Sequence, residues 1–178
     1  RTCLDFFFFL FGNNKNVWII DKALGEKEGK GQISICKEAS TISTLSNKWK
    51  SEGRFADNYT WEETQSVDIT TLDKLIEVYG IPKFCKIDVE GFELSVLKGL
   101  SHSIPCISFE FTQEFFDDAI LCMEHLLTIG KVRFNFSVGE NQKLVSERWG
   151  TKDDLVAQIK TMQRDELLWG DIYAMMKF

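Results

Sequence analysis

The sequence predicts an α/β fold in which helices cover both faces of a mostly parallel sheet that ends in an antiparallel terminal strand. Strand-like and helix-like segments alternate along the chain. Several strand-like segments are short continuous apolar runs, which is typical of strands buried on both faces of a parallel sheet. The chain has 178 residues, of which 44% are hydrophobic. This is enough to bury one core, so we predict a single domain over residues 1–178.

The first apolar segment, residues 6–11, is a run of phenylalanine and leucine. It is too short to span a membrane, which takes about 20 apolar residues. It also lacks the basic start and the cleavage site of a secretory signal. We predict the end of a buried helix here. Because such a helix needs partners to cover it, the run suggests that sequence is missing upstream of Arg1.

The segments that follow predict strands and a polar loop. Residues 16–21 form an apolar run bounded by polar residues, which predicts a buried strand. Residues 23–29 predict a turn, and the alternation in residues 32–36 predicts a half-buried strand. Residues 37–59 are rich in Ser, Thr, Asn and charged residues, with a short helix predicted at 46–52. This polar segment is a candidate substrate loop.

The centre and the end of the chain alternate between strands and helices. The patterns predict strands at residues 65–69, 84–88, 105–111 and 132–136 and helices at 72–79, 90–98, 115–130 and 152–162. Thr70 or Thr71 can cap the first of these helices, and a capping box of Thr151 and Asp154 begins the last. Residues 172–178 predict a closing strand, antiparallel and at the edge of the sheet.

Charge and cysteine usage narrow the function classes. The formal net charge is -6, which disfavours nucleic acid as a partner because binding to phosphates needs clustered Lys and Arg. The five cysteines are scattered without a C-x-x-C spacing, which fits a reducing, cytoplasmic setting. We expect no membrane span. His102 and His125 have no partners at ligand spacing, so we predict no metal site.

Acidic residues at the ends of the predicted strands are the candidate site residues. In an open α/β sheet, ligands bind outside the carboxyl ends of the strands. Asp21, Asp88 and Glu110 stand at or near such ends, and Glu90 and Gly91 directly follow the second strand. Each carboxylate also has a structural interpretation: Asp21 as a turn residue, Asp88 and Glu90 as helix-capping groups, Glu110 as a side chain on a polar face.

A cluster of hydroxyl side chains lies in the polar loop, at residues 40–46. Thr41, Ser43 and Thr44 could hydrogen-bond a polyhydroxylated ligand, although such runs are also common in solvated loops. The sequence contains no P-loop, no G-x-S-x-G and no G-x-G-x-x-G. The sequence therefore contains no motif that supports phosphate binding by a P-loop or hydrolysis by a catalytic serine.

One segment resembles a known family closely. Residues 86–99 read KIDVEGFELSVLKG, which is similar to the signature of FkbM-type methyltransferases. Residues 22–29 (KALGEKEG) and 70–75 (TTLDKL) resemble two further family segments, in the expected order. The resemblance implies a class I methyltransferase, Rossmann-like fold and the cofactor S-adenosyl-L-methionine. It also implies that the family's glycine-rich first strand and its second strand precede Arg1, so that the chain is N-terminally truncated.

The resemblance implies roles for the candidate residues in methylating a hydroxyl of a sugar or secondary metabolite. The acceptor is then a small molecule or a glycan. The implied roles are general base for Asp88 or Glu90, cofactor binding for Asp21, Ala23, Leu24, Asp88 and Gly91, and substrate binding for Thr41, Ser43, Thr44 and Glu110. The alternative is a truncated, non-catalytic module of the same fold that serves as a binding or scaffold protein.

Overall fold

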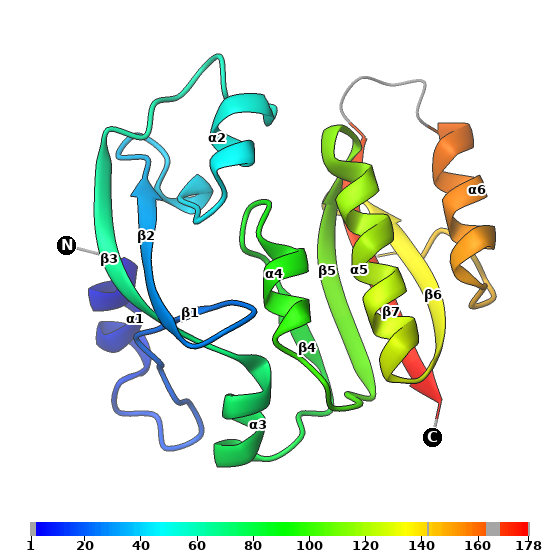
Figure 1. Cartoon of the computed structure of the whole chain (residues 1–178), viewed down its shortest axis with the longest axis horizontal. Coiled ribbons are helices and arrows are strands. Elements are labelled where there is room, and N and C mark those ends of the chain that lie inside the picture. The colour runs from blue at the N-terminus through cyan, green and yellow to red at the C-terminus, as the bar shows by residue number, and fades with distance from the viewer. Residues whose placement is uncertain (1–2, 142, 163–167, 178) are drawn as a thin grey trace.

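The computed structural model describes residues 3–141, 143–162 and 168–177, and it contains two mixed sheets beside several helices (Figure 1). The first sheet has the strand order β1 (Ala23–Leu24), β3 (Glu63–Thr70), β2 (Gly29–Ile35). The second has the order β4 (Cys85–Ile87), β5 (Cys106–Thr112), β7 (Trp169–Lys177), β6 (Lys131–Val138). The α/β class is therefore confirmed.

The prediction of a mostly parallel sheet is wrong. Among the described residues, only the pairs β1–β3 and β4–β5 are parallel, whereas β2–β3, β5–β7 and β6–β7 are antiparallel. The prediction of an antiparallel terminal strand is confirmed, but β7 lies between β5 and β6 and not at the edge. Ile172 and Ala174 on this strand are fully buried, which is typical of an inner strand.

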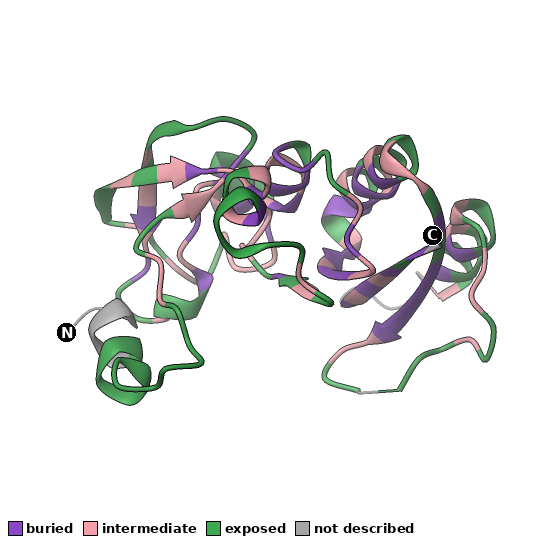
Figure 2. Ribbon diagram, turned by 90° about the horizontal axis from the view of Figure 1, so that it is seen from below, coloured by how far each residue is buried: buried purple, intermediate pink, exposed green. Residues whose placement is uncertain are grey.

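The N-terminal segment also differs from the prediction. A helix is present, α1 (Cys3–Phe11), but its apolar residues from Phe7 onward are exposed, and Phe9 is 82% exposed (Figure 2). The helix is therefore not buried. The strand predicted at residues 16–21 is absent: these residues are in coil, and Trp18 is 69% exposed. The first strand begins only at Ala23.

The remaining helices follow the predicted pattern. Ser46 caps α2 (Asn47–Glu52) by accepting the Trp49 N–H, and Thr71 caps α3 (Leu72–Tyr79) by accepting the Lys74 N–H. The capping box of Thr151 and Asp154 precedes α6 as predicted. The other helical segments are the short turns η1 (Ser40–Ile42) and η2 (Gln113–Phe115), α4 (Glu93–Lys98), α5 (Phe116–Ile129) and α6 (Lys152–Met162).

The two faces of the four-stranded sheet differ in character. Alternate side chains of β5, including Phe109 and Phe111, belong to one core with apolar residues of α4, α5 and α6. Figure 1 shows α4 and α5 in front of the strands and α6 beside β6. The other face carries polar groups such as Lys86, Glu110 and Asp171, which are exposed or half-buried. In the described chain the helices thus cover one face of this sheet, not both as predicted.

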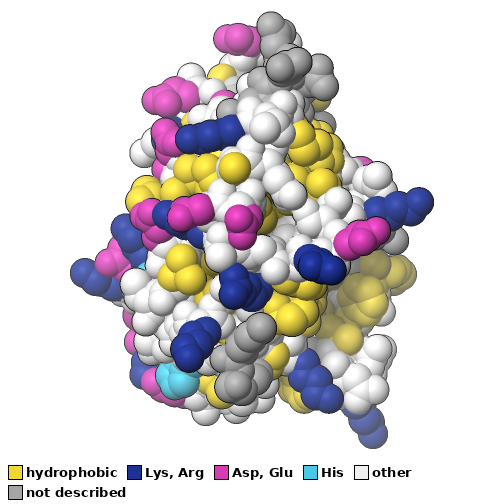
Figure 3. Space-filling model, turned by 90° about the vertical axis from the view of Figure 1, so that its right-hand side faces the viewer, with side chains coloured by type: hydrophobic (Ala, Val, Ile, Leu, Met, Phe, Trp, Pro, Cys, Tyr) yellow, Lys and Arg dark blue, Asp and Glu magenta, His cyan; other side chains and the backbone are white. Residues whose placement is uncertain are grey.

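Surface charge is mixed on the face that Figure 3 shows. Basic and acidic side chains are interspersed there and form no continuous basic surface. None of the described helices is long and apolar enough to cross a membrane.

Candidate functional site

A row of carboxylates crosses the polar face of the four-stranded sheet at one end. Glu110 on β5 is paired with Asp171 on β7, and the pair Ile87–Phe109 puts Asp88, which follows β4, on the other side of Glu110. Glu90 comes two residues later in the β4–α4 turn. One carboxylate oxygen from each of Asp88, Glu90 and Glu110 lies within 4.8 Å of those of the other two. We call these three residues the carboxylate triad.

The β4–α4 turn holds Glu90 in an unusual backbone conformation. Glu90 has φ 52° and Gly91 has φ 81°, and Glu90 is the one described residue other than glycine with a positive φ. Backbone strain of this kind is concentrated at functional sites. A Cβ on residue 91 would lie 3.0 Å from Trp49 Cε3, so glycine also permits close packing against α2.

The polar loop supports this turn directly. The Thr44 hydroxyl donates a hydrogen bond of 2.7 Å to the Glu90 carbonyl oxygen and accepts one of 2.8 Å from the Ser46 N–H. Thr44 is only 1% exposed. This bond joins the polar loop to the backbone of Glu90, a triad residue that lies 46 residues further along the chain.

Burial and mutual repulsion raise the pKa of two triad carboxyls. Burial, followed by the charges of Asp88 and Glu93, raises the pKa of Glu90 to about 7. Burial, followed by the charges of Glu90 and Asp88, raises the pKa of Glu110 to about 8. Of the nearest cations, Lys86 pairs with Asp171 and, at 3.4 Å, with the triad residue Asp88, and Arg54 pairs with Glu114 at 2.8 Å.

The triad opens into a cavity of about 1010 Å³. Five of its lining residues are acidic, four are aromatic, and Arg54 is its one basic side chain among the described residues. The lining consists of Glu38, Thr41, Ile42, Trp49, Arg54, Phe55, Asn58, Tyr59, Asp88, Glu90, Glu110, Thr112, Glu140 and Trp169. A smaller cavity of about 230 Å³ shares Trp49, Glu110 and Thr112 with it. The combination of aromatic surface and a few polar groups is usual for small-molecule sites.

Two buried polar atoms at this cavity have no hydrogen-bond partner in the described parts of the chain. They are the indole Nε1 of Trp49 and the hydroxyl Oγ1 of Thr112. Trp49 is 2% exposed and Thr112 is 5% exposed. Since buried polar groups are nearly always hydrogen-bonded, both atoms need a partner that the described residues do not supply.

The residues predicted from the sequence fall into three groups. Asp88, Glu90, Glu110 and Thr41 line the larger cavity, and Gly91 lines the smaller one. Ser43 and Thr44 bond to backbone: the Ser43 hydroxyl accepts the Cys36 N–H, and Thr44 holds Glu90. Asp21, Ala23 and Leu24 are not in the lining of either cavity, and Asp21 is exposed. The cofactor-binding role of these last three stays a prediction.

Several lining residues were missed by the reasoning from sequence. Trp49, Arg54, Phe55 and Tyr59 all lie within the polar segment that was predicted as a substrate loop. Aromatic residues in a polar loop are the signal that could have identified them, because such side chains need a surface to cover. Thr112 had no comparable signal.

In this α/β protein, polar groups gather where β4 ends beside β5. This arrangement is typical of the broad class of proteins that bind ligands at the carboxyl edge of a sheet. The methyltransferase FkbM domain matches residues 13–143, more than half of the chain. The protein is therefore a member of the FkbM methyltransferase family, a family of S-adenosylmethionine-dependent enzymes. No curated protein and no solved structure gave a match.

Proposed function

We propose that the protein methylates a hydroxyl group of a sugar or secondary metabolite, with the acceptor bound in the 1010 Å³ cavity at the carboxylate triad. The observation that carries this proposal is the convergence of Asp88, Glu90 and Glu110 where β4 ends beside β5. These groups can accept the proton that a hydroxyl must lose when it is methylated.

The cavity suits the cofactor that the family uses. S-adenosylmethionine, when bound, supplies an electrophilic methyl group on a positively charged sulfur. Five lining carboxylates favour a cation, and the one lining arginine, Arg54, is already paired with Glu114. The volume of about 1010 Å³ is at the upper end of the range for ligand sites, which leaves room for a second molecule.

Glu90 is the residue we assign as proton acceptor. Its pKa of about 7 is close to neutral, where a general base is most effective. Asp88 adjoins it and is held by Lys86 at 3.4 Å, so Asp88 orients and polarises the acceptor hydroxyl. The cofactor would supply the methyl group and leave as a neutral thioether, and the part of this chain would be to take the hydroxyl proton on the Glu90 carboxylate.

The aromatic lining favours an acceptor with extended apolar faces and several hydroxyls. Ring surfaces are offered by Trp49, Phe55, Tyr59 and Trp169. Alignment of the acceptor by such contacts accelerates a displacement reaction by fixing its geometry.

Glu90→Gln and Asp88→Asn test this proposal. Each change removes a proton-accepting carboxylate and nearly preserves its shape. We expect methyl transfer from labelled S-adenosylmethionine, screened against sugar and polyketide hydroxyl acceptors, to fall by about 100-fold or more. Cofactor affinity, measured by calorimetry, should fall far less than turnover, because the other lining carboxylates remain.

The matched control is Glu77→Gln, which neutralises a carboxylate on the exposed surface of α3. It should retain full turnover. If Glu90→Gln and Asp88→Asn both turn over at the rate of this control, the assignment of the triad as the site of proton transfer is wrong.

A further inference from the structure

We infer that the carboxylate triad binds a divalent cation with a preference for oxygen ligands: Mg²⁺, Mn²⁺ or Ca²⁺. The three carboxylates come from the end of β4, the β4–α4 turn and β5, and each offers an oxygen within 4.8 Å of the other two. Carboxylate oxygens are the ligands that these cations prefer.

The spacing of the oxygens fits a single ion. Oxygens on opposite sides of Mg²⁺ lie about 4.2 Å apart and those on opposite sides of Ca²⁺ about 4.8 Å, from metal–oxygen distances of about 2.1 and 2.4 Å. The triad oxygens span no more than 4.8 Å. One cation can therefore contact all three carboxylates with little rearrangement of the side chains.

A second and independent observation comes from Thr112. It follows Glu110 by two residues on β5, so both side chains lie on the same face of the strand. Thr112 lines the same cavity as the triad, is 5% exposed, and its Oγ1 has no hydrogen-bond partner among the described residues. A hydroxyl in this position can accept a hydrogen bond from a water bound to the cation, and Mg²⁺ in particular keeps several waters.

The surrounding charges leave a place for a cation. In the described chain, neither Glu90 nor Glu110 forms an ion pair; Asp88 is paired with Lys86 at 3.4 Å, Lys86 is bonded more closely to Asp171, and Arg54 is bonded to Glu114. Three carboxylates this close together repel one another, and like charges side by side on neighbouring strands destabilise a sheet. A divalent cation would remove this repulsion.

The role of the cation in methyl transfer rests on the proposed function. A hydroxyl bound to a metal ion loses its proton more easily than a free one. A carboxylate that binds the ion through one oxygen keeps its second oxygen for that proton. Acceptors with two adjacent oxygens, such as vicinal diols, would be favoured because both oxygens can bind the same ion.

The test measures cation binding by the whole protein without cofactor or acceptor. Calorimetry and thermal unfolding with MnCl₂, MgCl₂ and CaCl₂ should show saturable binding of one ion per chain, with a dissociation constant of about 1 mM or tighter. Glu110→Gln and Asp88→Asn should each weaken binding by about tenfold or more.

Asp88 has a side chain that is 54% exposed, so its substitution leaves packing intact. Asp117→Asn, an exposed carboxylate at the start of α5, is the control and should bind as the wild type does.

Absence of binding at about 10 mM of all three cations would overturn the inference. Equal binding by the triad variants and by Asp117→Asn would do so as well. If the cation binds but no hydroxyl acceptor is methylated, the metal site stands and the proposed function fails. If methylation proceeds at full rate in a chelator, the cation has no part in the reaction.

Discussion

Glu110 and its two neighbours on β5 face opposite sides of the sheet, one side being the core and the other the candidate site. Its neighbours Phe109 and Phe111 are buried in the core with 0% and 2% exposure, while Glu110 lies on the opposite face of β5 and lines the cavity. The carboxyl is half-buried and faces Asp88 and Glu90. For this reason its pKa rises to about 8, and the folded protein keeps a proton there that the unfolded chain loses.

This difference predicts that Glu110→Gln stabilises the protein at alkaline pH. Between the ordinary pKa of a glutamate and about 8, the folded state binds more protons than the unfolded state, so stability falls as pH rises. In the presence of a chelator, the variant should unfold at a higher temperature than the wild type at pH 8.5, with a gain of about 2 kcal/mol. At pH 4.5 the two proteins should be similar. If the variant is no more stable than the wild type at pH 8.5, the Glu110 carboxyl does not destabilise the folded protein at alkaline pH.

At the site, sequence reasoning identified the acidic residues but not how they lie together. Asp88, Glu90 and Glu110 were each recognisable because they follow or occupy predicted strands. Their mutual distance depends on the pairing of β4 with β5, which no local pattern encodes. The same limit explains Thr44: its hydroxyl looked like a ligand-binding group, but it bonds to a carbonyl that is 46 residues away in the sequence.

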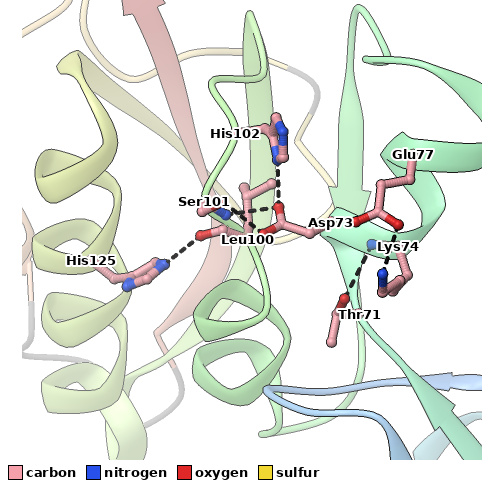
Figure 4. Close-up of polar contacts among 8 residues, drawn as sticks. All are labelled: Thr71, Asp73, Lys74, Glu77, Leu100, Ser101, His102 and His125. Carbon is pink, nitrogen blue, oxygen red and sulfur yellow. Dashed lines mark hydrogen bonds and ion pairs between the residues drawn. The ribbon is translucent and has the colours of Figure 1, made fainter.

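Several polar contacts anchor the start of α3 (Figure 4). Asp73 in its first turn accepts hydrogen bonds from the Ser101 N–H and hydroxyl, at 2.8 and 2.7 Å, and contacts His102 Nδ1 at 2.9 Å. Burial opposes the charge of Asp73, but the bonds from His102 and Ser101 outweigh it and lower the pKa to about 2. The start of α3 is thereby fixed to the loop that follows α4.

Asp73→Asn should therefore destabilise the protein. The lowered pKa means that the charged carboxylate stabilises the fold at pH values above about 4, and that this contribution is lost as pH falls through about 2. At pH 7 we expect a loss of about 1 to 2 kcal/mol, measured by urea unfolding. Asp153→Asn, whose side chain is 92% exposed, should show no such loss. A loss of the same size at pH 2 and pH 7 would contradict the role of the charge.

Most elements could be predicted because their signals are local. The caps of α2, α3 and α6 and the apolar spacing of α5 lie within each segment, and these elements formed as predicted. Residues 16–21 have the composition of a buried strand, yet they are in coil because no neighbouring strand pairs with them. The prediction of strand order is wrong because the position of β7 between β5 and β6 depends on contacts between distant segments, which local patterns do not encode.

At the scale of the whole molecule, a bidentate ion pair joins the segment containing α2 to η2, which directly follows β5 of the four-stranded sheet. The guanidinium of Arg54 donates two bonds of 2.8 Å to the Glu114 carboxylate, and the Arg54 N–H donates a third at 3.1 Å. The two side chains are 12% and 23% exposed, so the pair is mostly shielded from water. Pairs of this geometry are stronger than ordinary surface ion pairs.

Arg54→Met should loosen this connection. We expect limited proteolysis within residues 47–62 to become about tenfold faster, because the open form of the segment is more populated when about 1.4 kcal/mol is lost. Lys37→Met removes the exposed pair with Glu63, both partners being more than half exposed, and should leave the cleavage rate unchanged. Equal cleavage rates in the two variants would mean that the segment is held by other contacts.

The bond from Thr44 to the Glu90 carbonyl has a consequence for how this enzyme can diversify. Under the proposed function, the loop that faces the acceptor also holds the backbone of Glu90, the residue assigned as proton acceptor. A loop transplanted from a relative to change specificity would bring new contacts for the acceptor but, without a hydroxyl at position 44, would also displace the base. On this proposal, a change of acceptor requires a threonine or serine to stay at position 44, whereas Thr41, which is exposed at the cavity and makes no such bond to Glu90, is the position to change.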